Sequence, residues 1–352
     1  MTGPRGLGSV WRTALALVLG GLSGLGAYSL HAPLPWMIGP LVGVTIAALS
    51  GVPLQGPDTI RPVVIPVLGV MLGSSLTPAI FAALGNWATT LVLLIPFLFA
   101  AAAASYAIYR RVGGYDRATA YFCAMPGGLN DMVVMGAGAG GNERKIALAH
   151  AARIFVVVVF VVLFFGLALG VTSGGMARNW VALSVLTPRD WLILTGCAAI
   201  GEPLARFLHL PAAPIFGPML LSGAAHITQS VALPPPSLLI IVAQVVIGTV
   251  LGCRFIGASL REVGWDLVLG LLSALAMLTV ALLFAGLVAW GTNVQITQAF
   301  LAFSPGGLAE MSLLALAMGQ DVAYVSVLHV VRITLVIGGA GVVFGWVSGS
   351  RR

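Results

Sequence analysis

An internal duplication is the feature of this sequence that most constrains its fold. Residues 124–154 and 303–333 align without a gap, and in both a Pro-Gly-Gly-Leu turn is followed by an acidic residue and then by a His-x-x-Arg-Ile sequence. The prolines Pro126 and Pro305 set the offset at 305 − 126 = 179 residues. Such a repeat takes precedence over any local motif, because each copy is expected to form the same structural unit.

The duplication extends over most of the chain. The stretch HAPLPWMIGPL from His31 is matched by HLPAAPIFGPML from His209, at an offset of 209 − 31 = 178 residues. A pair of glycines four residues apart also recurs, as Gly69 and Gly73 and as Gly248 and Gly252. We therefore divide the sequence into a first repeat (1–171), a linker (172–190) and a second repeat (191–352).

Composition places both repeats in a membrane. Hydrophobic residues make up 59% of the chain, charged residues make up 8%, and the mean hydropathy is +1.05, whereas a soluble domain has about 25% charged residues. The net charge of +7 comes from 17 basic residues that lie mostly between apolar runs, which is typical of membrane orientation rather than nucleic-acid binding. The three cysteines lack Cys-x-x-Cys spacing, so we expect small buried hydrophobes instead of a disulfide framework or a zinc site.

The apolar runs predict an all-α polytopic membrane protein. In the first repeat they cover residues 14–30, 33–51, 60–84, 89–109 and 146–171. Each is long enough to cross most or all of a hydrocarbon core of ~30 Å at ~1.5 Å per residue. The first run could be a signal peptide, but its counterpart in the second repeat is internal to the chain, so we expect a retained helix.

One further segment, at residues 118–141, is interrupted in its middle by Pro126, Gly127 and Gly128. A straight helix is disfavoured there. Two alternatives remain, a broken spanning helix and a re-entrant hairpin with the Pro-Gly-Gly turn at its tip. The corresponding residues of the second repeat are Pro305, Gly306 and Gly307.

Loop charges predict that the repeats are inverted. The loop near residues 73–85 is uncharged and its counterpart at 254–266 is charged, whereas the arginine-rich loop at 110–117 has an uncharged counterpart at 290–297. Under the positive-inside rule, equivalent loops then lie on opposite sides of the membrane. Inversion requires an odd number of crossings per repeat, which gives about ten transmembrane helices plus two re-entrant or broken Pro-Gly-Gly segments. About twelve helices in a parallel repeat is the alternative.

The duplicated P-G-G-L-x-[DE]-M segment, the H-x-P-x-P-W-M-I-G-P-L stretch and the H-x-x-R-I sequence resemble the bacterial membrane AbrB family, over about residues 10–348. That family carries the labels "putative ammonia monooxygenase" and "regulator of aidB expression". The resemblance implies a relation to the cation/proton antiporter and anion transporter superfamily, and hence a carrier-like fold of inverted repeats. The family shares only a name with the soluble DNA-binding AbrB.

The sequence supports the functions that these two labels name to different degrees. A monooxygenase needs clustered metal ligands, but the five histidines are dispersed, so enzymatic activity is weakly supported and we expect no cofactor. A DNA-binding regulator needs a soluble domain, for which the loops leave no room. We therefore expect a secondary-transporter-like protein that moves or senses a small solute. The alternatives are a membrane regulator of gene expression acting indirectly through a partner, and a monooxygenase-like protein.

This interpretation also predicts the partners, the location and the orientation of the protein. The partners are the lipid bilayer and a small-molecule or ion ligand, without direct contact to nucleic acid, and a homodimer is compatible with the sequence. The location is the bacterial inner membrane. Arginines near both ends of the chain favour a cytoplasmic position for both termini, against Arg178 and Arg189 in the linker.

The candidate substrate- or ion-binding residues are the polar, proline and glycine residues that occur in both copies of the turn and helix motifs. Each acid follows its turn by three residues, where a helix N-terminus favours it, and each arginine is expected deep in the membrane beside such an acid. His31 and His209, beside prolines at helix ends, are expected at the interface. The candidates are Pro126, Gly127, Gly128, Asp131, His150, Arg153, Pro305, Gly306, Gly307, Glu310, His329 and Arg332.

Overall fold

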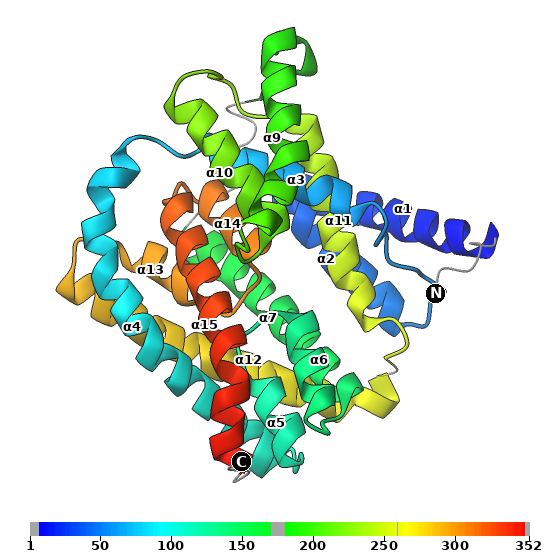
Figure 1. Cartoon of the computed structure of the whole chain (residues 1–352). Coiled ribbons are helices and arrows are strands. Elements are labelled where there is room, and N and C mark those ends of the chain that lie inside the picture. The colour runs from blue at the N-terminus through cyan, green and yellow to red at the C-terminus, as the bar shows by residue number, and fades with distance from the viewer. Residues whose placement is uncertain (1–6, 170–179, 259, 349–352) are drawn as a thin grey trace. The chain divides into compact units, whose positions relative to one another are not determined.

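The computed structural model describes residues 7–169, 180–258 and 260–348, and these residues form helices without any strand (Figure 1). Helices long and apolar enough to cross a membrane confirm the prediction of an all-α membrane protein at this level. In the described part of the chain they are Gly8–Ser29, Trp87–Val112, Glu143–Gly166, Ser237–Phe255, Gly264–Gly291 and Val322–Trp346.

The chain forms two compact units, and each unit contains parts of both sequence repeats. The first unit consists of residues 1–78, 162–260 and 316–319, and the second unit contains the remainder. The division in space therefore differs from the division of the sequence into repeats at 172–190, which stays a prediction about the sequence. Matching parts of the two repeats meet inside one unit.

The first unit is built from helices that pack across the repeats. Helix α3 lies against α10 of the other copy, just as α2 lies against α11. The repeated glycines explain these contacts, because a Cβ at Gly69 would lie 2.5 Å from the carbonyl oxygen of Ile215 and a Cβ at Gly248 would collide with that of Met37. The helices are α1 (Leu7–Ser29), α2 (Pro35–Leu49), α3 (Arg61–Ser74), α9 (Pro188–Phe207), α10 (Ala213–Ile227) and α11 (Ser237–Gly252).

Two of these helices are shorter than the sequence suggested. Helix α2 has 15 residues and α3 has 14, which corresponds to ~22 Å, less than a full hydrocarbon core. The run predicted at 60–84 stops at Ser74, and Gly85 lies inside the next helix. The loop that we placed near residues 73–85 is therefore wrong in extent and covers only residues 75–78. A single glycine does not end a membrane helix, in which glycine is common.

The repeated His-Pro stretches form identical helix ends. His31 and His209 both have φ of 55° and follow α1 and α9, where the next residue's amide bonds back into the last turn. This is the left-handed cap that ends many helices. Each following helix begins with proline in its first turn, where proline is favoured. The motif is thus a helix stop and start, while the interfacial position of the histidines stays a prediction.

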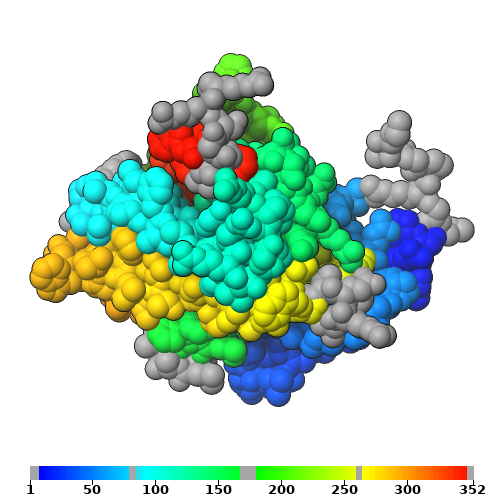
Figure 2. Space-filling view, turned by 90° about the horizontal axis from the view of Figure 1, so that it is seen from below, coloured from blue at the N-terminus to red at the C-terminus, as the bar shows by residue number. Residues whose placement is uncertain are grey.

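The second unit contains two long helices from equivalent positions of the repeats, α4 (Ala79–Ala107) and α12 (Leu260–Gly291). They run antiparallel, because Ser105 bonds Ser273 at 2.6 Å while Phe97, two turns earlier, stacks edge-on against Phe284. In Figure 2 the cyan segment that contains α4 lies beside the yellow-to-orange segment that contains α12. Helix α4 continues into a short π-helical turn at Ile108–Val112.

Two helical hairpins complete this unit, together with two long helices that hold them. The first hairpin is α5 (Arg117–Ala124) and α6 (Leu129–Gly138), and the second is α13 (Ile296–Phe303) and α14 (Leu308–Ala317). The long helices are α7 (Glu143–Leu169), which extends into the first unit, and α15 (Val322–Ser348).

The chain reverses its direction at each Pro-Gly-Gly turn. Beyond α6, the amide of Asn142 donates to Thr119 Oγ1 in the first turn of α5 at 2.8 Å. Likewise Thr297 Oγ1, in the first turn of α13, donates to Gln320 Oε1 beyond α14 at 3.1 Å. The start and the end of each segment are therefore adjacent. Each segment is therefore folded as a hairpin, with arms of 8 and 10 residues or ~12 and ~15 Å, while its re-entrant position in the membrane stays a prediction.

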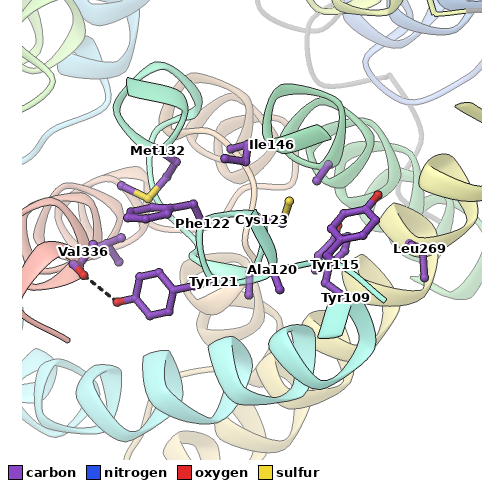
Figure 3. Close-up of a cluster of buried hydrophobic side chains, with 13 residues drawn as sticks. Tyr109, Tyr115, Ala120, Tyr121, Phe122, Cys123, Met132, Ile146, Leu269 and Val336 are labelled. Carbon is purple, nitrogen blue, oxygen red and sulfur yellow. Dashed lines mark hydrogen bonds between the residues drawn. The ribbon is translucent and has the colours of Figure 1, made fainter. Parts of the chain in front are cut away.

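A buried aromatic cluster fixes the first hairpin in place (Figure 3). Phe122 and Met132 from its two arms pack with Ile146 of α7 and Val336 of α15. The phenol of Tyr121 donates to the carbonyl oxygen of Ala340 at 2.8 Å. These contacts pack both arms of the hairpin against α7 and α15, and such van der Waals packing is a main cause of helix association within a membrane.

Candidate functional site

The two arginines of the repeated motif lie deep in the second unit. Arg153 and Arg332 each occupy the eleventh position of a 27-residue helix, which is ~15 Å from the helix start. Their exposed fractions are only 3% and 2%. Both arginines therefore lie well inside their helices, and their predicted depth in the membrane stays a prediction.

The partners of these arginines are backbone carbonyls at the hairpin tips. Arg153 donates from Nη1 to Met125 O at 2.8 Å and from Nη2 to Gly127 O at 3.0 Å. Arg332 repeats this pattern, with Nη1 to Ser304 O and Nη2 to Gly306 O, both at 2.6 Å. The two nitrogens of one guanidinium group thus span the carbonyls on either side of the proline.

The predicted compensation of the arginines by Asp131 and Glu310 stays a prediction, while the terminal guanidinium nitrogens donate to these carbonyls. The physical reason lies in the turn itself. Proline interrupts the helical bonding, so carbonyls at the C-terminal end of the first arm lack intrahelical partners. A cation is favoured at that negative end of a helix, and each hydrogen bond from a charged donor contributes about 1.5–3 kcal/mol.

The histidines one turn before the arginines are also fully buried. His150 Nε2 donates to Phe122 O, near the end of α5, at 2.9 Å, and His329 Nδ1 donates to Val325 O in its own helix at 2.9 Å. The first contact joins α7 to the hairpin. The second lies within α15, and His329 also interacts with the backbone of Ser304 at the end of α13.

The two acids fold back toward their own turns. A Cβ at Gly128 would collide with the carboxylate of Asp131, and a Cβ at Gly307 would collide with that of Glu310. Each acid stands at the third helical position of α6 or α14, where an acidic side chain reaches back toward the N-cap residue. Asp131 is exposed and Glu310 is 8% exposed. The structure thus brings each acid to the helix N-terminus, and the second glycine of each turn leaves room for it.

The prolines and the first glycines define the shape of each tip. Pro126 and Pro305 are buried and follow an extended residue that ends the first arm. A Cβ at Gly127 would lie 2.9 Å from Val336 Cγ1, so the first tip packs closely against α15. A Cβ at Gly306 would instead meet the side chain of Met311, within its own hairpin.

Several buried side-chain nitrogens of the motif lack a hydrogen-bond partner. They are Arg153 Nε, Arg332 Nε, His150 Nδ1 and His329 Nε2, and the only other such atoms found in the described residues are Gln244 Oε1 and Thr249 Oγ1 in the first unit. The sequence motif marks these side chains but not the carbonyls that accept their hydrogen bonds, because every residue carries a backbone carbonyl.

A polar cluster at the base of the first hairpin carried no recognisable signal in the sequence. The phenol of Tyr115 donates to Asp266, and the ammonium group of Lys145 lies 4.2 Å from the centre of the Tyr115 ring. Burial, followed by the hydrogen bond to Asp266, raises the pKa of Tyr115. Within residues 7–169, 180–258 and 260–348, three or more histidine, cysteine or acidic side chains do not gather as metal ligands do.

The helices and the paired hairpins define a polytopic helical membrane protein. A family model described as "Transition state regulatory protein AbrB" matches residues 36–348, and the chain belongs to this family. It is 26% identical over 329 residues to the "Putative regulator AbrB" of Escherichia coli strain K12, covering 92% of this chain and 93% of that protein. It is 27% identical over 285 residues to the "Uncharacterized protein YhjN" of Bacillus subtilis strain 168, covering 77% and 74%.

Proposed function

We propose that the protein is a secondary-carrier-like membrane protein that binds a small solute between its two hairpin tips, to move it or to sense it. The observation that carries this proposal is the pair of hairpins, each turned at Pro-Gly-Gly and each held by a buried arginine of the following helix. Discontinuous helices that meet at matched positions of two repeats are the usual binding sites of secondary transporters.

The proposal includes inverted repeats with re-entrant hairpins. Antiparallel packing of the equivalent helices α4 and α12 supports it, because a two-fold axis between antiparallel spanning helices lies in the membrane plane. Hairpin arms of ~12 to ~15 Å reach only about half of a hydrocarbon core, which suits entry and exit on one side. The loop charges then orient the chain in the inner membrane with both termini in the cytoplasm.

A membrane regulator acting through a partner is the second candidate. The names of the family and of the Escherichia coli relative favour it. Solute binding at the hairpins is common to a carrier and to a sensor. Dependence on the partner distinguishes them, because a carrier acts alone in a lipid vesicle whereas a regulator needs its cytoplasmic contact.

The test combines binding with transport. A screen of metabolites against the purified protein should find at least one compound that raises its unfolding temperature, since a ligand of the folded state stabilises it by mass action. That compound should then enter vesicles that contain only this protein. Binding without uptake would favour the sensor.

The matched variants are Gly127→Val, which places a branched side chain against Val336, and Gly286→Val, at a helical position where a Cβ meets open space. The first should lose the ligand response and the second should keep it. A screen in which nothing binds, or a ligand response that survives in Gly127→Val, would contradict the proposal.

A further inference from the structure

We propose that three exposed arginines at the base of the first hairpin bind the phosphate groups of anionic membrane lipids. They are Arg110, Arg111 and Arg117, which we call the basal arginines, and they lie between the end of α4 and the first residue of α5. The proposal concerns the outer surface of the second unit, so it holds equally for a carrier and for a sensor.

The loop before α5 gathers the basal arginines into one corner. Arg110 Nη1 donates to Tyr115 O at 2.7 Å, and the amide of Tyr115 donates to Tyr109 O at 3.1 Å. The loop therefore folds back onto the π-helical turn that carries Arg110 and Arg111. Because Arg117 begins α5 only two residues after Tyr115, all three arginines belong to this corner.

This corner is attached to the first turns of α12. The phenol of Tyr115 donates to Asp266, and a Cβ at Gly113 would lie 2.6 Å from Leu269 Cδ1. Figure 3 shows the stacked rings of Tyr109 and Tyr115 beside Leu269. The position of α12 in the membrane therefore also gives the level of the basal arginines.

Two exposed tryptophans mark the ends of α12. Trp265 is 56% exposed and Trp290 is 89% exposed, and their separation of 290 − 265 = 25 residues corresponds to ~37 Å of helix. That length slightly exceeds a hydrocarbon core of ~30 Å, and tryptophan favours the headgroup level at both membrane surfaces. Trp265 adjoins Asp266, so the basal arginines lie at the level of the lipid phosphates.

The charges at this corner suit a phosphate group. In the part of the chain that the structure describes, Arg111 and Arg117 form no ion pair. Asp116 instead caps α5, and Asp266 accepts from Tyr115, while Glu143 is exposed at the start of α7. A guanidinium group binds a phosphate with two parallel hydrogen bonds, and clusters of basic residues beside a membrane helix attract anionic lipids.

The second hairpin provides an internal comparison. Its base, next to Trp290, has the loop Thr292, Asn293, Val294 and Gln295, which carries no charged side chain. The two bases are equivalent in the repeat but differ in their charge. Preference for an anionic lipid should therefore be confined to the base of the first hairpin.

The experiment measures this preference by fluorescence quenching in phosphatidylcholine bilayers. One fluorophore is attached at Val112→Cys, which is 53% exposed beside Arg111, and in a second protein at Asn293→Cys, also exposed. The three native cysteines are buried. Nitroxide-labelled phosphatidylglycerol should quench the label at residue 112 at a lower mole fraction than nitroxide-labelled phosphatidylcholine does. At residue 293 the two lipids should quench equally.

Removal of two basal arginines should abolish this difference. Each basic residue near an anionic surface contributes a factor of about 5 in affinity, so Arg111→Gln with Arg117→Gln should reduce the preference by about 25-fold. The control is Arg189→Gln with Arg206→Gln, which removes the same charge from exposed positions at opposite ends of α9 and should keep the preference. Raising NaCl to about 0.5 M should weaken it in the wild type.

Equal quenching by both lipids at residue 112 would overturn the proposal without any arginine variant. The same preference at residue 293, or a preference that survives in Arg111→Gln with Arg117→Gln, would overturn it as well. Two soluble competitors cover other ligands at constant ionic strength. Displacement of the lipid by millimolar inorganic phosphate would assign the corner to free phosphate, and a fluorescence response to polyglutamate without any lipid preference would assign it to an acidic protein segment. Either result contradicts lipid binding.

Discussion

Replacement of Arg153 by methionine tests how the buried arginines are held. Methionine keeps most of the length of the side chain but donates no hydrogen bonds, so Met125 O and Gly127 O lose their partners. At about 1–3 kcal/mol for each buried group left unsatisfied, Arg153→Met should reduce the free energy of unfolding by ~2 to ~6 kcal/mol. Asp131→Asn, at an exposed position, should cost less than ~1 kcal/mol.

The double variant separates the two accounts of this arginine. If carbonyls hold it, the effects of Arg153→Met and Asp131→Asn should add to within about 0.5 kcal/mol. Denaturant unfolding in detergent can be followed with a thiol-reactive fluorogenic dye, because Cys123 in the first arm of the hairpin is buried, at 2% exposure. A loss of ~3 to ~5 kcal/mol in each single variant, with recovery in the double variant, would show a buried ion pair and refute the carbonyl account.

Three further predictions concern the hairpins and helix ends, each measured as the free energy of unfolding. Gly127→Ala should cost ~1–3 kcal/mol because its Cβ presses on Val336, whereas Gly138→Ala, facing open space, should be neutral or stabilising; equal effects would contradict the close packing of the tip. Asp116→Ala should cost ~1 kcal/mol by removing the N-cap of α5. Burial alone would raise the pKa of Asp116, but its hydrogen bonds outweigh burial and lower that pKa. The stability that Asp116 contributes is therefore present above the unfolded pKa and is lost as pH falls through the folded pKa. If the pH dependence of unfolding is the same in Asp116→Ala as in the wild type, this account is contradicted. His31→Gly should stabilise by about 1 kcal/mol at this left-handed position, and a loss of stability would indicate that the imidazole makes contacts of its own.

The sequence allowed prediction of those features that depend on pattern alone. The duplication located both Pro-Gly-Gly turns, and the spacing from the charged residues before each helix placed Arg153 and Arg332 deep inside it. Composition predicted helices that span a membrane, and the matched motifs predicted the family. These signals are local or periodic, so they survive without knowledge of long-range contacts.

The partners of the buried groups could not be predicted in the same way. Every residue has a backbone carbonyl, so the residue types at these positions do not identify Met125 O or Ser304 O as the acceptor for an arginine. The choice between a broken helix and a hairpin depended on Thr119 meeting Asn142 across the turn, a contact that periodicity does not encode. The packing of α3 against α10 and of α2 against α11 likewise depends on close backbone approach at Gly69 and Gly248, which is visible only in the folded chain.

The sidedness of the two hairpin bases tests the central claim, that repeat-related hairpins enter the membrane from opposite sides. Single cysteines at Glu143 and Asn293, both exposed beside the bases of the first and second hairpins, can be labelled in intact cells with a membrane-impermeant thiol reagent. The three native cysteines are buried and serve as the background. We expect Asn293→Cys to react from outside and Glu143→Cys to react only after permeabilisation. Labelling of both from the same side would contradict the inverted arrangement and favour a parallel repeat.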